Sequence, residues 1–361
     1  MSKSVPLKRI HHLELIVGNA KQAAYFYRKA LGFEQFAYLG PETGHPERAS
    51  YALRQGKITL VLTTPLSHMD PLNIFLNLHG DSVKDIAFEV DDCDQVYQQV
   101  IERGAKPWEA PAHHQDKRGR VRRGSICTYG DTIHSFIAKK DYDGSFLPGF
   151  ESIHRPGQST GLLRIDHVVG NVEDRQMDRW CDWYNRILGF HQFVSYDDKD
   201  INTDYSALRS KVMANDNRQI KFPINEPADG LIKSQIQEYI DFHVKAGVQH
   251  IAMLTGDIIG SVSQLRENGL EFLEVPQGYY DRVWDRVGDI KEDKSQIEEL
   301  GILVDSDDSG YLLQLFTKPI EDRPTLFIEI IQRRGSESFG KGNFRALFET
   351  IEQEQRIRGN L

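Results

Sequence analysis

The sequence contains two copies of one pattern, and this internal repeat limits the possible folds more than any other feature. Residues 27–36 (YRKALGFEQF) match residues 184–193 (YNRILGFHQF), an offset of 157 residues from 27 to 184. Residues 83–87 (VKDIA) match residues 248–252 (VQHIA), an offset of 165 residues from 83 to 248. The offset grows by about eight residues, which indicates a small insertion in the second copy. The chain of 361 residues is therefore predicted to consist of two related halves.

A stretch rich in Gly, Pro and Ser separates the two copies. It covers residues 142–161 and contains the motifs DGSFLPG and RPGQSTG. Such composition is typical of a linker. We place the boundary at residue 155, with domains 1–155 and 156–361.

Within each half, strand-like and helical patterns alternate. In the first half, residues 10–17 are strand-like, and Asn19 can cap a helix that ends at Gly32. Short apolar strands follow, and a second helical pattern ends at Gly104. Each half therefore reads as β-α-β-β-β twice, which predicts an α+β fold. A terminal helical pattern over 344–355 is predicted either to pack on the domain or to act as a lid.

Composition excludes several functional classes. The formal net charge is −9, with 44 basic and 53 acidic residues, which disfavours general binding to nucleic acid. The basic run 117–123 is interpreted as a solvated hairpin. Cys93, Cys127 and Cys181 show no CxxC spacing, and a reducing compartment fits them. We expect no signal peptide and no segment of the ~20 apolar residues that cross a membrane, so the expected location is the cytoplasm.

Two histidines and one carboxylate in the second half are candidate metal ligands. His167 and His250 each enter a strand-like segment, and Glu329 lies inside an apolar one. A buried carboxylate is costly unless it is paired or binds a metal. This set suits the facial triad of non-haem Fe(II) oxygenases. Spacing alone leaves other combinations of the thirteen histidines open.

The first half lacks this set. It has Asp85 where the second half has His250, and its last strand-like segment, 132–137, contains no carboxylate. His243 falls on the apolar face of a helical pattern and is predicted to be packed, not to bind a metal. The sequence 305–310 (DSDDSG) is interpreted as a turn between strands, because a calcium loop needs Glu at its twelfth position, where this chain has Phe316.

Several longer motifs carry a family resemblance. The sequence resembles the 4-hydroxyphenylpyruvate dioxygenase family of the vicinal oxygen chelate superfamily over nearly its whole length. The motifs that carry the resemblance include RIDHVVGN (164–171), KFPINEP (221–227), GVQHIA (247–252), GYLLQLFTKP (310–319) and FGKGNF (339–344).

The resemblance implies a fold, a cofactor and a reaction. Each half is implied to be a barrel-like sheet of paired modules, the first a degenerate structural copy, with a gating helix at the C-terminus. One Fe(II) per chain is implied to bind His167, His250 and Glu329. The implied reaction converts 4-hydroxyphenylpyruvate and O2 to homogentisate and CO2, a step of tyrosine and phenylalanine catabolism. A homo-oligomer, either a dimer or a tetramer, is also implied.

Matching positions suggest roles for pocket residues. The polar residues implied to contact the substrate are Ser206, Asn225, Gln235 and Gln249, with Gln314 near the metal side of the pocket. Phe316 and Phe344 are implied to sandwich the substrate ring. The remaining implied pocket residues are Phe327, Phe339, Pro223, Asn343 and Leu347. From the residues alone, the aromatic side chains would be interpreted as core, and each amide could equally be structural.

Two rival functions stay open. A 4-hydroxymandelate synthase would share the substrate and the iron site. Phe316, Pro223 and Asn225 are of the dioxygenase type, which favours the dioxygenase. A non-catalytic ligand-binding protein of the same fold is the rival from another class, and the complete set of metal ligands argues against it.

Overall fold

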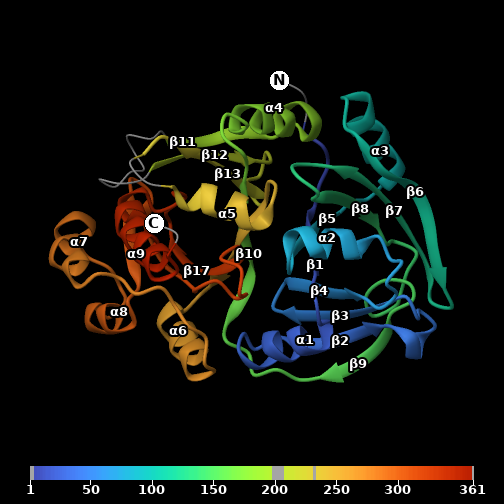
Figure 1. Ribbon diagram of the computed structural model, residues 1–361, viewed down its shortest axis with the longest axis horizontal. Coiled ribbons are helices and arrows are strands. Elements are labelled where there is room, and N and C mark those ends of the chain that lie inside the picture. The colour runs from blue at the N-terminus through green and yellow to red at the C-terminus, as the bar shows by residue number, and fades with distance from the viewer. Residues whose placement is uncertain (1–3, 197–206, 231–232, 360–361) are drawn as a thin grey trace.

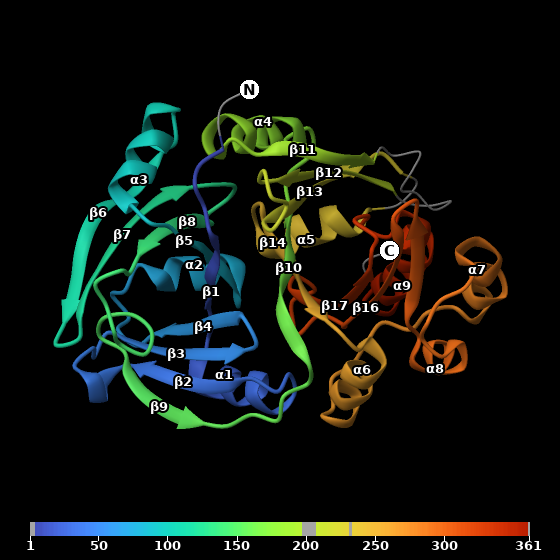
Figure 2. The same cartoon turned by 180° about the vertical axis from the view of Figure 1, so that it is seen from behind.

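The structure is a computed structural model that describes residues 4–196, 207–230 and 233–359. Within these ranges the chain forms two curved sheets that lie side by side, with helices packed around and between them (Figure 1). The view from behind shows the same division (Figure 2). None of the helices in the described ranges has the length and apolar character needed to cross a bilayer.

The first half contains two β-α-β-β-β modules, as predicted. Its elements are β1 (Arg9–Ile16), α1 (Ala20–Lys29), β2 (Glu34–Leu39), η1 (Pro41–Thr43), β3 (Arg48–Gln55), β4 (Ile58–Pro65), α2 (Leu72–His79), β5 (Ser82–Glu89), α3 (Cys93–Glu102), β6 (Pro107–Asp116), β7 (Gly119–Cys127), β8 (Ile133–Ala138) and β9 (Glu151–Arg155). The described strands form one sheet in the order β6-β7-β8-β5-β1-β4-β3-β2-β9.

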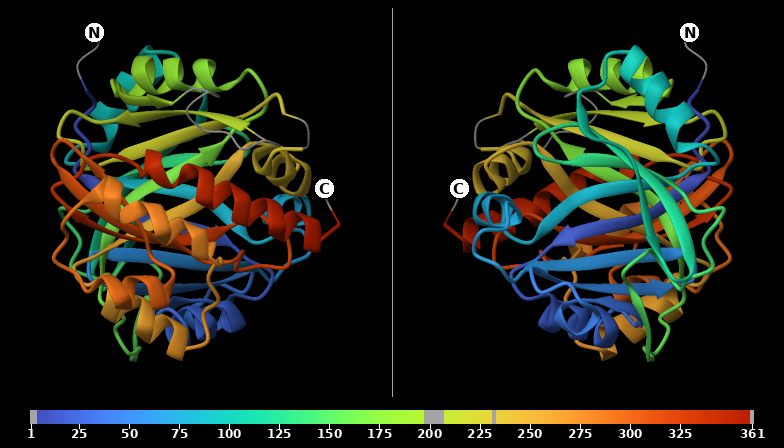
Figure 3. Two further views of the ribbon diagram at one scale, coloured as in Figure 1. Left: turned by 90° about the vertical axis from the view of Figure 1, so that its left-hand side faces the viewer. Right: turned by 90° about the vertical axis from the view of Figure 1, so that its right-hand side faces the viewer.

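The second half repeats both modules and adds helices. Its elements are β10 (Leu162–Asn171), α4 (Met177–Leu188), β11 (His191–Tyr196), β12 (Ala207–Ala214), β13 (Lys221–Ala228), α5 (Gln235–His243), β14 (Gly247–Thr255), α6 (Ile258–Glu267), η2 (Gln277–Tyr279), α7 (Tyr280–Val287), α8 (Lys294–Leu300), β15 (Leu303–Asp307), β16 (Gly310–Phe316), β17 (Phe327–Arg334), η3 (Lys341–Asn343) and α9 (Phe344–Ile357). The described strands are ordered β11-β12-β13-β10-β14-β17-β16-β15. Helix α9 runs across the outer side of this half (Figure 3, left).

Local sequence explains where the repeated helices begin and end. Asn19 caps α1 by accepting a hydrogen bond from the backbone N–H of Gln22. In α4, Cys181, Tyr184 and Leu188 recur every three to four residues and are buried against the sheet. Gly189 then ends the helix with a φ of 71°, a conformation that glycine adopts at little cost.

The two halves share a packed interface. The Tyr184 hydroxyl lies 2.9 Å from Nε2 of His134 in the first half, and both side chains are buried. Gly170 sits directly on Tyr129, where an added Cβ would lie 2.7 Å from the Tyr129 ring. Strand β9 ends at Arg155, and β10 begins at Leu162.

Strand register identifies equivalent positions in the two halves. Glu14 of β1 pairs with Asp85 of β5, and Val169 of β10 pairs with His250 of β14. Asp85 therefore occupies the position of His250. On their other sides, β5 pairs in parallel with β8 and β14 pairs in parallel with β17. In these pairs Asp85 aligns with Ile133, and His250 aligns with Phe327.

Two residues beyond Ile133, strand β8 carries Ser135, and two residues beyond Phe327, strand β17 carries Glu329. Ser135 therefore occupies the position of Glu329. The basic run forms the predicted hairpin between β6 and β7. The interpretation of the whole run as solvated is wrong for Arg123, whose side chain turns inward. Its guanidinium lies 3.3 Å from both Asp85 Oδ2 and Ser135 Oγ, and Ser135 Oγ donates to Asp85 Oδ2 at 2.5 Å.

A side-chain cation thus stands beside the carboxylate at this place in the first half. Within the described ranges, the first half has no group of three metal-binding side chains like the one in the second half.

Candidate metal centre

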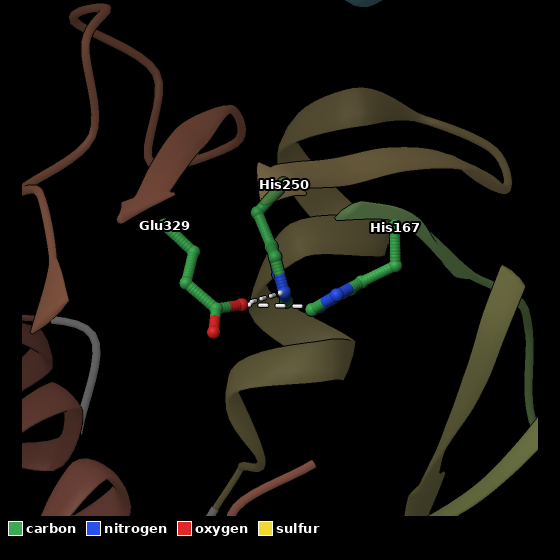
Figure 4. Close-up of side chains that lie close together, drawn as sticks. All are labelled: His167, His250 and Glu329. Carbon is green, nitrogen blue, oxygen red and sulfur yellow. Dashed lines mark ion pairs between the residues drawn. The ribbon is translucent and has the colours of Figure 1, made fainter. Parts of the chain in front are cut away.

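Three neighbouring strands bring the candidate ligands together (Figure 4). On β14, His250 and Ala252 point to the same face because side chains alternate along a strand. Ala252 pairs with His167 of β10 on one side and with Glu329 of β17 on the other. The small Ala252 side chain leaves open the space between its two large neighbours. His250 borders the same space from two residues away.

The ligand atoms of these three residues converge. One donor atom from each lies within 4.8 Å of the others. Nε2 of His167 is 3.1 Å from Glu329 Oε2, and Nε2 of His250 is 3.4 Å from the same oxygen. All three side chains are buried.

The opposite nitrogen of each imidazole has a local partner. His167 Nδ1 lies 2.8 Å from Asp166 Oδ1, and His250 Nδ1 lies 3.0 Å from Gln249 Oε1. An oxygen acceptor at Nδ1 favours the tautomer with its proton there and leaves the Nε2 lone pair toward Glu329. Two nitrogen donors and one carboxylate oxygen therefore face one point.

Burial and mutual contacts shift the pKa values of these three side chains. Burial raises the pKa of Glu329, but the charges of His167 and His250 outweigh it and lower that pKa to about 2. Burial lowers the pKa of His167, but Glu329 and Asp166 outweigh it and raise that pKa. Burial lowers the pKa of His250, with a smaller contribution from His167. The donor set fits Fe(II), because three protein ligands leave positions open for substrate and O2.

A cavity adjoins the three ligands. The predicted pocket residues that line it are Pro223, Asn225, Gln235, Gln249, Phe316, Phe327, Phe339, Phe344 and Leu347.

Aromatic rings also pack on the candidate ligands. The Phe327 ring stacks on that of His250 at 4.7 Å, and the Phe339 ring meets that of His167 edge-on at 5.1 Å. The two rings that the resemblance places around the substrate differ in their contacts. The Phe316 ring meets the His250 ring at 6.0 Å, and the Phe344 ring meets that of Tyr196 at 5.2 Å.

Two of the described residues implied to belong to the pocket, Gln314 and Asn343, are not among those that line this cavity. Gln314 is buried beneath Gly340, where an added Cβ would lie 2.3 Å from the Gln314 amide nitrogen. Asn343 is fully buried, and its Oδ1 accepts a hydrogen bond from the Tyr279 hydroxyl at 2.6 Å. Ser206 lies outside the described residues.

Ser210 lines the cavity and is absent from the residues chosen by sequence. It lies on β12 between two other lining residues, Leu208 and Val212, at the spacing of two expected for one face of a strand. Ser210 also pairs with Asn225 across the β12–β13 ladder. The alternation of β12 was therefore the signal that could have found it.

His243 is packed, as its helical pattern predicts. His243 is buried, with its ring stacked on those of His79 and Tyr239 at 4.4 and 5.0 Å. His113 lies exposed on β6.

Comparison with known proteins defines the class. A model of the Glyoxalase/Bleomycin resistance protein/Dioxygenase superfamily matches residues 9–128 and 164–315. The two-module halves and the buried His-His-Glu group are consistent with an enzyme of this superfamily.

Individual relatives indicate one enzyme family within this superfamily. A 4-hydroxyphenylpyruvate dioxygenase of Danio rerio is 50% identical over 97% of this chain and 91% of its own. That of Aspergillus fumigatus is 47% identical over 98% of this chain and 94% of its own. The solved structure of a mutant 4-hydroxymandelate synthase from Streptomyces coelicolor is 31% identical, with a TM-score of 0.87 over 97% of this chain and 99% of that one. The chain belongs to the 4-hydroxyphenylpyruvate dioxygenase family, which implies a non-haem iron enzyme.

Proposed function

We propose that this chain converts 4-hydroxyphenylpyruvate and O2 to homogentisate and CO2, using one Fe(II) held by His167, His250 and Glu329. The observation that carries the proposal is the convergence of three buried donors at the wall of an aromatic cavity. The reaction balances, since CO2 leaves with the substrate's own carboxyl carbon and its two oxygens, and both atoms of O2 are retained in the product, one in the new carboxylate and one in the new ring hydroxyl. When bound, the iron supplies the oxygen chemistry and an anchor for the α-keto acid.

The polar lining residues are proposed to orient the substrate. Ser210 and Asn225 face each other across two strands, and Gln235 lies in the first turn of α5. Gln249 holds His250 with its carbonyl oxygen, which leaves its amide N–H groups to donate toward a substrate oxygen. Few polar groups in an apolar cavity suffice to fix the orientation of a small ligand.

Helix α9 is proposed to open and close the cavity. Phe344 and Leu347 line the cavity from this helix. The enclosed space is about 70 Å³, well below the ~300 Å³ of typical ligand pockets. We therefore expect side chains of α9 to move outward when substrate enters. Their return would exclude water during the reaction.

Replacing Phe344 with alanine is expected to raise KM about tenfold while leaving bound iron unchanged. An aromatic contact contributes ~1 kcal/mol beyond its buried area, and tenfold corresponds to ~1.4 kcal/mol. Steady-state kinetics and iron content would be measured on the same preparation. The matched control is Ile357→Ala on the same helix, at a side chain that is 72% exposed. Equal KM values for both variants would contradict the proposed contact.

The function itself is tested by product analysis. Purified protein is supplied with Fe(II), ascorbate and 4-hydroxyphenylpyruvate in air, and the products are separated beside authentic standards. Homogentisate supports the proposal. 4-Hydroxymandelate would mean that the fold and the metal site are right and the orientation of the substrate is wrong. Bound iron without product would favour a non-catalytic ligand-binding protein.

Three wider proposals follow. Residues 1–155 are proposed to be a structural half, because Arg123 stands beside Asp85 where the second half has its metal ligands. A cytoplasmic location is proposed, since Cys93, Cys127 and Cys181 are all free thiols. A homo-oligomer, a dimer or a tetramer, is expected from the family, and light scattering during size-exclusion chromatography would test it.

A further inference from the structure

Asp166 occupies an unusual environment beside His167. Its side chain is fully buried, yet both carboxylate oxygens are bonded. Oδ1 accepts from His167 Nδ1 at 2.8 Å and from Lys221 Nζ at 3.1 Å. Arg333 donates two hydrogen bonds to the carboxylate, from Nη2 to Oδ1 at 2.8 Å and from Nε to Oδ2 at 2.9 Å. Two cations thus bond directly to one carboxylate, and a third, Arg164, lies 4.0 Å from its Oδ2.

This enclosure keeps the carboxylate charged. An isolated buried carboxylate would take up a proton. Here a two-pronged arginine contact and a lysine favour the ionised form, and such contacts are stronger and better oriented than neutral hydrogen bonds. The ionised Asp166 can only accept, so His167 must present Nδ1–H to it and direct Nε2 away, toward Glu329.

The two candidate ligand histidines are therefore held differently. The partner of His167 Nδ1 is the charged carboxylate of Asp166, whereas the partner of His250 Nδ1 is the neutral amide oxygen of Gln249. A charged partner both orients a metal-binding imidazole and raises its basicity, which an amide does less well.

Arg333 extends this anchor to the cavity wall. Its Nη1 donates to the backbone carbonyls of Ser336 and Ser338, at 3.3 and 2.6 Å. Its guanidinium also lies 5.3 Å from the ring centroid of Phe339, a residue that lines the cavity and contacts the His167 ring. One side chain thus contacts the partner of a ligand and the segment that leads into α9.

We propose that Asp166, held by Arg333 and Lys221, is the positioning residue that orients His167 for metal binding. Arg333 joins that position to the cavity wall at Phe339. The proposal rests on the metal role proposed above for His167, and it adds a source of metal affinity outside the three ligands.

The test measures metal affinity without turnover. Metal-free protein is titrated with Co²⁺ in competition with a chromophoric chelator, and the visible spectrum of bound Co²⁺ is recorded. Asp166→Asn keeps the shape and removes the charge, and we expect it to weaken Co²⁺ binding about 10- to 100-fold with an altered spectrum. Gln249→Ala is expected to weaken it less.

The matched control is the neighbouring arginine. Arg334 pairs with Glu292 at 2.9 Å at the surface, so Arg334→Met should bind Co²⁺ as the unsubstituted protein does. Arg333→Met is expected to weaken Co²⁺ binding. Arg333→Lys keeps the charge but cannot donate two parallel hydrogen bonds to the carboxylate, so it should restore Co²⁺ binding only in part. If Asp166→Asn fails to fold, the Arg333 pair decides the question.

The outcomes separate the two proposals. Unsubstituted protein that binds no Co²⁺ would contradict the proposed metal centre itself. Tight binding by the unsubstituted protein, with folded Asp166→Asn or Arg333→Met binding equally well, would overturn only the positioning role. A lowered melting temperature with unchanged affinity would likewise mean that Asp166 is merely structural.

Discussion

Replacing His250 with alanine is expected to reduce homogentisate formation at least about 10³-fold. The change removes one of three donors that converge on a single point. A bound metal ion contributes several kcal/mol to the transition state, and about 4 kcal/mol corresponds to ~10³-fold in rate. Product formation would be followed by chromatography, with iron content determined on the same samples.

The matched control uses a histidine at the surface of the same half. His191 begins β11, with a side chain that is 36% exposed. His191→Ala should retain both iron and activity. If His250→Ala kept full activity, the assignment of the ligands would be wrong. If it kept its iron but lost activity, His250 would act on the substrate and not on the metal.

Replacing Arg123 with methionine is expected to lower the free energy of unfolding by about 3 kcal/mol. Removing one partner of a buried ion pair typically costs ~3–5 kcal/mol, because the other charge stays buried without compensation. Asp85 is completely buried and keeps its two bonds from Ser135, whereas the Arg123 side chain is itself 27% exposed, so the loss is placed at the lower end of that range. Chemical denaturation followed by circular dichroism would measure it.

Arg122 provides the control one residue away. It pairs with Asp94 at 2.7 Å at the protein surface, and exposed pairs contribute ~0.2–1 kcal/mol. Arg122→Met should therefore cost less than 1 kcal/mol on the same scale. Equal losses for the two variants would show that Arg123 is not the internal cation of the first half.

The loss at Arg123 should depend on pH. Burial raises the pKa of Asp85 to about 6, against the opposing charge of Arg123. When the pKa of a carboxyl group is raised in the folded state, the folded protein loses stability as the pH rises through that pKa. Without Arg123 the pKa rises further, so the deficit should be larger at pH 8 than at pH 5. Adding Asp85→Asn to Arg123→Met should remove this dependence.

Elements and repeats could be predicted because their causes are local. Asn19 caps a helix through its own side chain, and the face of α4 follows from a spacing of three to four residues. The β-α-β-β-β modules required only these signals and the match between the copies. The same logic applied to β12 would have found Ser210, because the alternation of a strand is also local.

The side of a sheet that faces a particular partner or the cavity could not be predicted in this way. Alternation places Arg122 and Arg123 on opposite sides of β7, but it does not decide that Arg122 pairs with Asp94 and Arg123 with Asp85. Gln314 and Asn343 are buried outside the cavity lining, Gln314 close against Gly340 and Asn343 hydrogen-bonded to the Tyr279 hydroxyl. Position within a motif does not record which side of a sheet faces the cavity.

The sequence by itself determined the repeated modules, the boundary signals and a short list of metal-binding residues. The tertiary structure alone decided which of thirteen histidines share a site. That decision depends on the register between β10, β14 and β17, which places His167 and Glu329 on either side of Ala252. The hydrophobic pattern of each strand limits its register, but between strands far apart in the chain the partner and the alignment are settled only when the whole sheet packs.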